Sequence, residues 1–439
     1  MNLSAYLPEL EQSKTLFIDG DETVTVSHFI ERVNYLKGFL SHLHNKNVVV
    51  QLHSDYDFIS AIVAMDGICK SMFLLPADTD DQLRESLSLD AKSDFLLREL
   101  PSINESLKPQ ASKKSLNEVD TNWILATSGT TGKPKLIHHN IKSLLRTCKK
   151  THQNSNNNVW ALLYQPQRYA GLQVVLQVIV AGNTLVLTKG IFEQQVKSIM
   201  NGQTNCLSAT PSMWRKLLIN GSIKKLHFKQ ITLGGEAVDS NILTNLVKEF
   251  PSARVVHIYA STEAGVGFVV KDKQVGFPLQ WLETGVDNVE LKLSVNNTLL
   301  LKQKIMPKGN EIDNRLDIDG YFDTEDVVEI NNDRVIFLGR DSGVINVGGN
   351  KVHPEEIESI LRGFDLIADV RVYPKKNPMI GQLVAADIVL TESFDNHKEI
   401  KKQITGLCKE YLPLYKVPNI IRIVDSISLN FNGKVERKS

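Results

Sequence analysis

A segment dense in hydrogen-bond donors is the first part of this sequence that could do chemistry. Residues 127–135 read TSGTTGKPK and place four hydroxyl side chains, two glycines and two lysines directly behind an apolar run. Glycines allow successive backbone N–H groups to converge on an anion, and the hydroxyl groups add donors around the rim. The segment therefore predicts a loop that holds a polyphosphate.

This loop differs from a Walker phosphate loop. Only two residues separate Gly129 from Gly132, and Pro134 stands where a Walker loop has the Ser or Thr that holds magnesium. Stretches of Ser, Thr and Gly are also common in plain surface turns, so the loop alone leaves a structural interpretation open. The rest of the chain has to distinguish between the two.

Five further motifs follow the loop along the chain. They are LGGEA at 233–237, YASTE at 259–263, GYFDTED at 320–326, GRDSGVINVGGNKVHPEEIE at 339–358 and NGKVERK at 432–438. With these motifs the sequence resembles the adenylate-forming superfamily of acyl-CoA synthetases, peptide-synthetase adenylation domains and luciferases, from about Thr25 to Lys438. One such match is a weak signal, whereas six in the family's order are a strong one.

The resemblance implies an ATP-dependent carboxylate ligase. Such an enzyme attacks the α-phosphate of ATP with the acid, releases pyrophosphate, and passes the acyl group of the acyl- or aryl-AMP to a thiol. The first step needs positioning and charge neutralisation more than a protein nucleophile, which suits motifs rich in donors, lysines and carboxylates. The implied cofactors are ATP and Mg²⁺, the acceptor is CoA or the phosphopantetheine of an acyl carrier protein, and the other partner is a small carboxylic acid.

The resemblance also implies where the nucleotide lies. The phosphate loop would be formed by Thr127, Ser128, Gly129, Thr130, Thr131, Gly132 and Lys133, and the adenine side by Gly234, Gly235, Glu236, Tyr259, Ala260 and Ser261. Tyr259 would stack on adenine, because an aromatic face is a platform for a base. Asp326 would accept from both ribose hydroxyls, and Arg340 would offer its planar fork of donors on the same side.

Three residues would carry the chemistry. Thr262 would donate to the α-phosphate, and Glu263 would hold Mg²⁺ through carboxylate oxygen, which this hard ion prefers. Lys434 follows Asn432 and Gly433, a dipeptide suited to a type I′ turn, and would bridge the attacking carboxylate and the α-phosphate from a loop tip. Interpreted structurally, Glu263 would be an acid at a helix start and Lys434 a solvated cation of the tail.

A glycine-rich joint divides the chain near residues 341–343. It connects a large N-terminal adenylation core, 1–341, to a small C-terminal domain, 342–439, with strand and helix signals of its own. In the family the small domain rotates between the two half-reactions. Ser342 would be the hinge residue, and Gly348 and Gly349 would line the tunnel of the thiol acceptor.

The acyl side of the site departs from the family pattern. Many members have His or an aromatic residue on this loop; counted back from Gly171 in YQPQRYAG, this sequence has Arg168, with Tyr169 beside it. A guanidinium is costly to bury alone, so Arg168 must turn to solvent, pair with a protein carboxylate, or meet a polar group of the substrate. Arg168 and Tyr169 are therefore the acyl-pocket candidates.

Strand and helix signals alternate along most of the chain. A helix is expected from Thr25 to about Leu43, with Ser27 as its cap, and strands are expected at NVVVQLH, MFLLP, NWILAT, VWALL, TLVLT, NCLSAT, KQITLGG and RVVHIYA. This pattern predicts an α/β fold with a large doubly wound N-terminal domain. Short strands from about 274 to 338 predict a β subdomain within it, and the last 98 residues, 342–439, a small mobile α+β domain. Ligands of doubly wound sheets bind at the carboxyl ends of the strands, where TSGTTGKPK begins.

Composition limits the partners. The chain has 439 residues with 50 basic and 50 acidic side chains, which argues against a coat for nucleic acid or a membrane-surface role. Its four cysteines form no CxxC pair, its start does not resemble a secretory signal, and its longest apolar stretch is interrupted by Gln173, Gln177 and Asn183. We therefore expect a cytoplasmic enzyme without a membrane span.

Two other functions remain open from the sequence. The chain could be a stand-alone adenylation enzyme for an amino acid, although no acidic residue marks a site for an α-amine. It could also be a degenerate member that only binds a nucleotide, because the stretch around 290–310 and the N-terminal region are trimmed relative to the family. The presence of Glu263, Asp326, Arg340 and Lys434 argues against the second.

Overall fold

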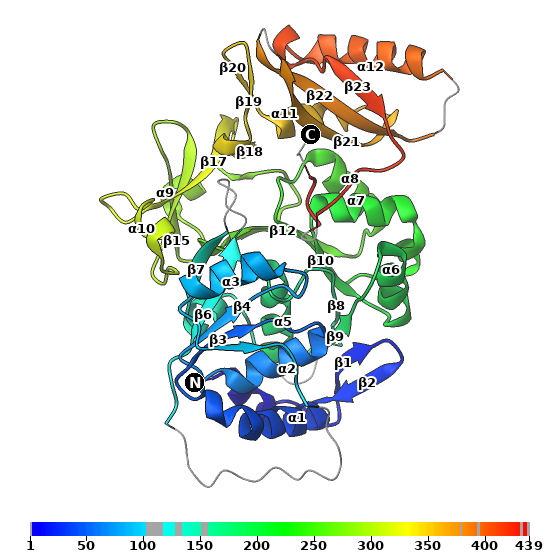
Figure 1. The fold of residues 1–439 in the computed structure, drawn as a ribbon. Helices are drawn as coiled ribbons and strands as arrows, with labels where there is room; N and C mark the ends of the chain where they lie inside the picture. The colour runs from blue at the N-terminus through cyan, green and yellow to red at the C-terminus, as the bar shows by residue number, and fades with distance from the viewer. Residues whose placement is uncertain are drawn as a thin grey trace.

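The computed structural model describes residues 2–101, 117–127, 134–150, 157–377, 380–392, 396–430 and 433–436, except for the side chains of residues 310 and 311. Within these residues the chain forms four β-sheets with helices packed against them (Figure 1). Most of the loop expected between residues 101 and 120 lies outside the described residues. No helix in the described parts is both long enough and apolar enough to cross a membrane.

The first sheet has the order β5-β3-β4-β6-β7. Its strands are β3 (Asn47–Val50), β4 (Ser71–Leu74), β5 (Phe95–Leu97), β6 (Asn122–Thr127) and β7 (Lys135–His139), and only β7 is antiparallel to its neighbour. Helices α1 (Val26–Phe39), α2 (Asp55–Met65) and α3 (Asp81–Asp90) belong to the same part of the chain, and the short 3-10 helices η1 (Leu3–Glu9) and η2 (Leu40–Leu43) flank α1 in sequence. The helix expected after Thr25 is present, but Thr25 rather than Ser27 caps it, because the Thr25 hydroxyl accepts from the backbone N–H of His28.

The second sheet has eight strands in the order β13-β12-β11-β10-β8-β9-β1-β2. The parallel strands are β1 (Thr15–Asp19), β8 (Val159–Leu162), β9 (Thr184–Leu187), β10 (Cys206–Ala209), β11 (Gln230–Gly234) and β12 (Arg254–Ser261), with β2 (Glu22–Thr25) and β13 (Gly265–Val270) antiparallel at the edges. The helices of this part are α4 (Ile141–Leu145), α5 (Tyr169–Ala181), α6 (Phe192–Asn201), α7 (Pro211–Asn220) and α8 (Ser240–Glu249), with the 3-10 helix η3 (Ser222–Lys225). The predicted doubly wound α/β class is confirmed, but its strands are divided between two sheets.

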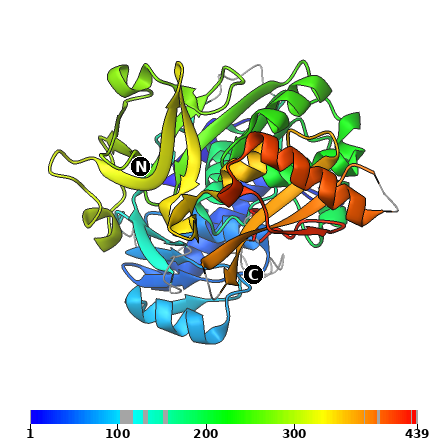
Figure 2. The same ribbon diagram turned by 90° about the horizontal axis from the view of Figure 1, so that it is seen from above.

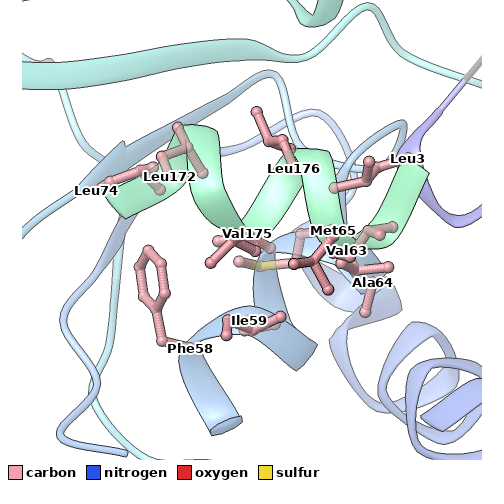
Figure 3. Close-up of a cluster of buried hydrophobic side chains, with 14 of the residues drawn as sticks. Leu3, Phe58, Ile59, Val63, Ala64, Met65, Leu74, Leu172, Val175 and Leu176 are labelled. Atoms are coloured by element: carbon pink, nitrogen blue, oxygen red, sulfur yellow. The ribbon is translucent and has the colours of Figure 1, made fainter. Parts of the chain in front are cut away.

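Helix α5 explains the division, because its buried side chains join both sheets in one core. Between Gly171 and Val180 of α5 only Gln173 and Gln177 are polar, and these two lie on one face of the helix, so the rest of its surface must be covered by other apolar elements. Figure 3 shows Leu172 and Val175 of α5 close to Phe58 of α2 and Leu74 of β4. Leu185 of β9 belongs to the same buried cluster. The two sheets therefore pack on α5 from different directions.

The third sheet is antiparallel, in the order β14-β18-β17-β16-β15. It consists of β14 (Phe277–Pro278), β15 (Val289–Leu293), β16 (Thr298–Gln303), β17 (Phe322–Asn331) and β18 (Arg334–Arg340), with short helices α9 (Trp281–Thr284) and α10 (Asn310–Asp313). This sheet is the β subdomain that the short strands of the sequence predicted. Its last strand carries the chain into the 3-10 helix η4 (Asp341–Gly343).

The fourth sheet belongs to the C-terminal part of the chain. It contains β19 (Ile345–Val347), β20 (Asn350–Val352), β21 (Ile367–Asn377), β22 (Gly381–Leu390) and β23 (Ile420–Ile423), with helices α11 (Pro354–Leu361) and α12 (His397–Tyr411) and the 3-10 helix η5 (Leu414–Lys416). It has its own apolar core and lies beside the third sheet in both views (Figure 1 and Figure 2). After β23 the chain runs back past α7 (Figure 1).

A buried carboxylate, Asp66, ties the start of the chain to the core around α5. Asp66, which is 3% exposed, accepts from the backbone N–H of Leu3 at 2.7 Å and from Trp123 Nε1 at 3.2 Å. Burial raises the pKa of Asp66 from 3.8 to about 6. The folded protein therefore binds more protons than the unfolded chain between these pH values, and this group destabilises the fold progressively as the pH rises through them.

Asp66→Asn should remove that pH dependence. The difference between the two pKa values corresponds to roughly 3 kcal/mol of stability lost by the parent protein between about pH 4 and pH 6.5. Thermal unfolding across this range should show the melting temperature of the parent falling relative to the variant. The exposed Asp21→Asn change is the control, and a parent–variant difference that stays constant with pH would contradict the assignment.

Candidate active site

The predicted site residues meet in one cavity. A cavity of about 1490 Å³ lies at the carboxyl ends of β6, β11 and β12, next to β17, β18 and the C-terminal segment. The predicted residues that line it are Thr127, Gly234, Gly235, Glu236, Tyr259, Ala260, Ser261, Thr262, Glu263, Asp326, Arg340, Lys434, Arg168 and Tyr169. Because these residues come from distant segments, the cavity is a product of the tertiary fold.

Several predicted residues are absent from this wall. Ser342 lies in η4, and Gly348 and Gly349 form the turn between β19 and β20, where their φ angles are +56° and +91°. None of these three residues lines the cavity in this arrangement of the chain. Ser128, Gly129, Thr130, Thr131, Gly132 and Lys133 lie outside the described residues.

Asp326 and Arg340 face each other across neighbouring strands. The register of β17 and β18 makes them partners, and Arg340 Nε donates to Asp326 Oδ1 at 3.2 Å. The Tyr259 hydroxyl donates to the other carboxylate oxygen, Oδ2, at 2.5 Å. An ionised carboxylate has about four acceptor positions, so two remain for further hydroxyl donors.

The Tyr259 ring belongs to an aromatic cluster. Phe268 and Phe337 stack on it with ring centroids 5.1 Å and 4.9 Å away and interplanar angles of 17° and 9°. Gly267 makes room for the ring, since a Cβ atom there would lie 2.9 Å from Tyr259 Cδ1. Side chains from β13 and β18 therefore stack on the Tyr259 ring, and the expected stacking of this ring on adenine stays a prediction.

Lys434 enters the cavity from the C-terminal segment. Its loop is closed by the backbone N–H of Gly433, which donates to Asn430 O at 2.8 Å, and Gly433 has a φ of +68° that favours glycine. The Lys434 side chain extends over Gly235, where a Cβ atom would lie 3.2 Å from Lys434 Cε. Burial lowers the pKa of Lys434, and the carboxylate of Glu236 opposes that change.

A buried histidine, which the sequence did not single out, supports the Thr262–Glu263 turn. His139 Nε2 lies 2.9 Å from the carbonyl oxygen of Thr262, and its ring stacks on Tyr169 with centroids 5.4 Å apart. Burial lowers the pKa of His139 to about 4, so the ring is neutral near pH 7 and donates from Nε2. His139 thereby connects the turn after β12 with the start of α5.

Arg168 and Tyr169 begin helix α5 on another wall of the cavity. Arg168 Nη1 donates to Ala126 O at 3.3 Å, and no Asp or Glu oxygen of the described residues lies within 4.0 Å of it. Burial lowers the pKa of Arg168. Tyr169 is buried, and its hydroxyl is hydrogen-bonded to the backbone of Val266. Tyr169 therefore forms a fixed wall, whereas Arg168 is a half-buried cation with no carboxylate of the described residues within 4.0 Å, and the charge of Asp78 acts on it only from farther away.

The charged groups of the site fit a nucleotide that is bound with a magnesium ion. Asp326 has free acceptor positions, Lys434 and Arg340 are cations, and Glu263 is a carboxylate on the cavity wall. The described residues contain no group of three or more His, Cys, Asp or Glu side chains suited to a metal. Glu263 would thus share a magnesium ion with phosphate oxygens and water, as this ion prefers.

Comparisons with known proteins agree with this site. The AMP-binding enzyme model matches residues 59–297, and the AMP-binding enzyme C-terminal domain model matches residues 356–434. The chain is 22% identical to a 2-succinylbenzoate–CoA ligase of Staphylococcus epidermidis over 99% of this chain and 97% of the relative. It is 25% identical to a D-alanine–D-alanyl carrier protein ligase of Staphylococcus aureus over 76% of this chain and 74% of the relative.

A solved structure has the same fold along the whole chain. It is the O-succinylbenzoate coenzyme A synthetase of Bacillus subtilis in complex with ATP and magnesium, with a TM-score of 0.73, 19% identity, and coverage of 99% of this chain and 98% of that chain. The fold and the site define an AMP-forming acid–thiol ligase. The chain belongs to the AMP-binding enzyme family, which confirms the resemblance carried by the six motifs.

Gly235→Ala should impair adenylate formation, and Gly234→Ala is its matched control. Gly235 has a φ of +83°, and an added methyl would lie 3.2 Å from Lys434 Cε, whereas a methyl on Gly234 makes an ordinary contact at 3.6 Å. The strained backbone and the displaced lysine should reduce pyrophosphate release by about tenfold or more. Equal losses in both variants would show that close approach of the nucleotide, rather than room for Lys434, requires these glycines.

Proposed function

We propose that this ligase activates a carboxylic acid that carries a second anionic or strongly polar group, and that it transfers the acyl group to CoA. The observation that carries this proposal is the Arg168 guanidinium, which lines the cavity without a carboxylate partner among the described residues. A ligand carboxylate would satisfy it bidentately. Relatives named 2-succinylbenzoate–CoA ligase support the proposal, because their acid has two carboxyl groups.

The proposal assigns roles to the nucleotide-side residues. Asp326 accepts from the ribose hydroxyls while Arg340 holds its carboxylate in place. Thr262 and residues 127–133 bind the phosphates, and Glu263 binds magnesium, which neutralises phosphate charge when bound. The backbone of Gly234 and Gly235 and the ring of Tyr259 form the adenine side.

Lys434 acts between the acid and the α-phosphate. Its Nζ atom lies 3.8 Å from a Cβ atom built at Gly235, on the wall of the cavity. A fixed cation at that place stabilises negative charge that develops as the carboxylate attacks phosphorus. The present arrangement of the chain is therefore the adenylate-forming one.

The second half-reaction requires the C-terminal sheet to move. We place the domain boundary between residues 341 and 342, with Ser342 as the hinge, since η4 is a short exposed helix that joins the third and fourth sheets. Rotation there would withdraw Lys434 and bring Gly348 and Gly349 to the cavity as the wall of the thiol tunnel. There is open space beside this turn, because no neighbouring atom lies closer than 4.0 Å to a Cβ atom added at Gly348 or Gly349.

The choice of a non-amino acid rests on charge, and the choice of CoA rests on the relatives named 2-succinylbenzoate–CoA ligase. An amino acid would bring an α-ammonium into a cavity whose acyl wall carries Arg168, and like charges oppose each other there. One relative is named D-alanine–D-alanyl carrier protein ligase, so transfer to a carrier protein is the alternative outcome of the tests. The same proposal places the enzyme in the cytoplasm, where ATP and CoA are available and its four cysteines stay free thiols.

Lys434→Ala should separate the two half-reactions. Loss of the cation should slow adenylate formation by about 10² or more, on the order of 3 kcal/mol. Thioester formation from supplied acyl-AMP and CoA should change little, because Lys434 has left the site by then. Single-turnover assays with 2-succinylbenzoate measure both steps, and equal losses would contradict the alternation between two arrangements.

Arg168→Met should change the preference among acids. The KM for 2-succinylbenzoate should rise about tenfold or more, roughly the 1.5–3 kcal/mol of a charged hydrogen bond. Benzoate and simple fatty acids should improve relative to it, because the desolvation cost of the guanidinium is removed. The ratio of kcat/KM values for the two kinds of acid is the measurement, and an unchanged ratio would exclude Arg168 from substrate recognition.

A further inference from the structure

Glu236 contacts protein backbone on two sides. The LGGEA motif groups it with the nucleotide-binding residues, but its carboxylate oxygens accept from two backbone N–H groups. Ser212 N donates to Glu236 Oε2 at 3.0 Å, and Val435 N donates to Glu236 Oε1 at 2.9 Å. Both oxygens of this carboxylate thus have a protein donor.

The first of these donors belongs to the N-terminal part of the chain. Ser212 lies in the first turn of α7, where backbone N–H groups have no partner within the helix and a negative charge is stabilised. Glu236 itself follows β11 of the same part. This bond does not depend on the position of the C-terminal sheet.

The second donor lies next to the catalytic lysine. Val435 is 7% exposed and directly follows Lys434. On the other side of Lys434, the fully buried Thr210 donates from Oγ1 to the carbonyl oxygen of Gly433. Thr210 also caps α7, since its Oγ1 accepts from Met213 N at 3.1 Å. The backbone is therefore held on both sides of Lys434 by the start of α7 and by Glu236.

We propose that Glu236 and Thr210 are positioning residues that latch the Lys434 loop onto the start of α7 and so hold the adenylate-forming arrangement. The role in catalysis rests on the proposed function, whereas the latch itself is a property of the fold. It differs from a nucleotide contact, because each carboxylate oxygen of Glu236 accepts from a backbone N–H group of the protein.

The contacts across this interface suit a joint that opens. If the C-terminal part moves away, Glu236 keeps the N–H of Ser212, while the Val435 N–H and the Gly433 carbonyl exchange their partners for water. The ion pair between Asp239 and Arg362 nearby, at 3.6 Å, has the same property. Asp239 keeps Arg215, and Arg362 keeps Asp369 at 3.1 Å, so separation leaves no buried charge unpaired.

Hydrogen exchange of the protein without ligands tests the latch directly. In the parent protein the amide of Val435 should be protected, and Glu236→Ala should raise the exchange rate of the fragment containing Val435 by about tenfold or more. Glu193→Gln, at an exposed site on α6, is the control. Unchanged exchange of α12 and β11 verifies the fold, and unchanged protection of Val435 would overturn the latch.

Half-reaction assays with 2-succinylbenzoate as the acid test the positioning role. Glu236→Ala and Thr210→Val should each slow adenylate formation by about tenfold to a hundredfold while thioester formation from supplied adenylate and CoA changes less than about threefold. Thr210→Ser keeps the hydroxyl and should restore the parent rate.

The outcomes separate the latch from the reaction. Faster exchange without loss of adenylate formation would overturn the positioning role. A slower reaction with Val435 still protected would assign Glu236 to direct nucleotide binding instead, which also overturns the latch. If the parent protein forms no adenylate with any acid, the proposed function fails, and the exchange experiment still decides whether the latch exists.

Discussion

The Lys434 ammonium reaches the cavity because the C-terminal segment returns to the start of α7. Its backbone is held on one side by Thr210 and on the other by Glu236, and the aliphatic part of its side chain lies over Gly235. A Cβ atom at position 235 would crowd the Lys434 side chain. The site of this ligase thus depends on the close approach of two segments that are far apart in the sequence, since 199 positions separate Glu236 from Val435.

The other charges of the site are balanced before any nucleotide binds. Arg340 and Tyr259 both donate hydrogen bonds to Asp326, and Phe268 and Phe337 stack on the Tyr259 ring. Groups fixed in this way need little reorganisation when charge develops in the reaction, which is how preorganised sites stabilise a transition state. Arg168 differs from them, because it has a carbonyl oxygen as its partner and no described carboxylate. For this reason we propose a partner from the substrate for Arg168 and not for the residues on the nucleotide side.

The charged groups at the boundary between the N-terminal sheets and the C-terminal sheet share one property. Arg362 and Asp239 each have a partner in their own part of the chain, and so does Glu236. Separation of the two parts would therefore break contacts without leaving a buried group unsatisfied. An interface of this kind favours one arrangement and still permits another, as a ligase with two half-reactions requires.

The sequence by itself determined the elements, the family and the residues that converge on the cavity. Strands β8 to β12 were predictable because short apolar runs bounded by turns specify strands locally, and Glu263, Asp326 and Lys434 were predictable because each lies in a motif whose residue types suit the chemistry. Only the tertiary structure decided which groups these residues contact. Phe337 stacks on Tyr259, and Glu236 accepts from Val435, because these contacts arise from packing between segments far apart in the sequence, which no local pattern encodes.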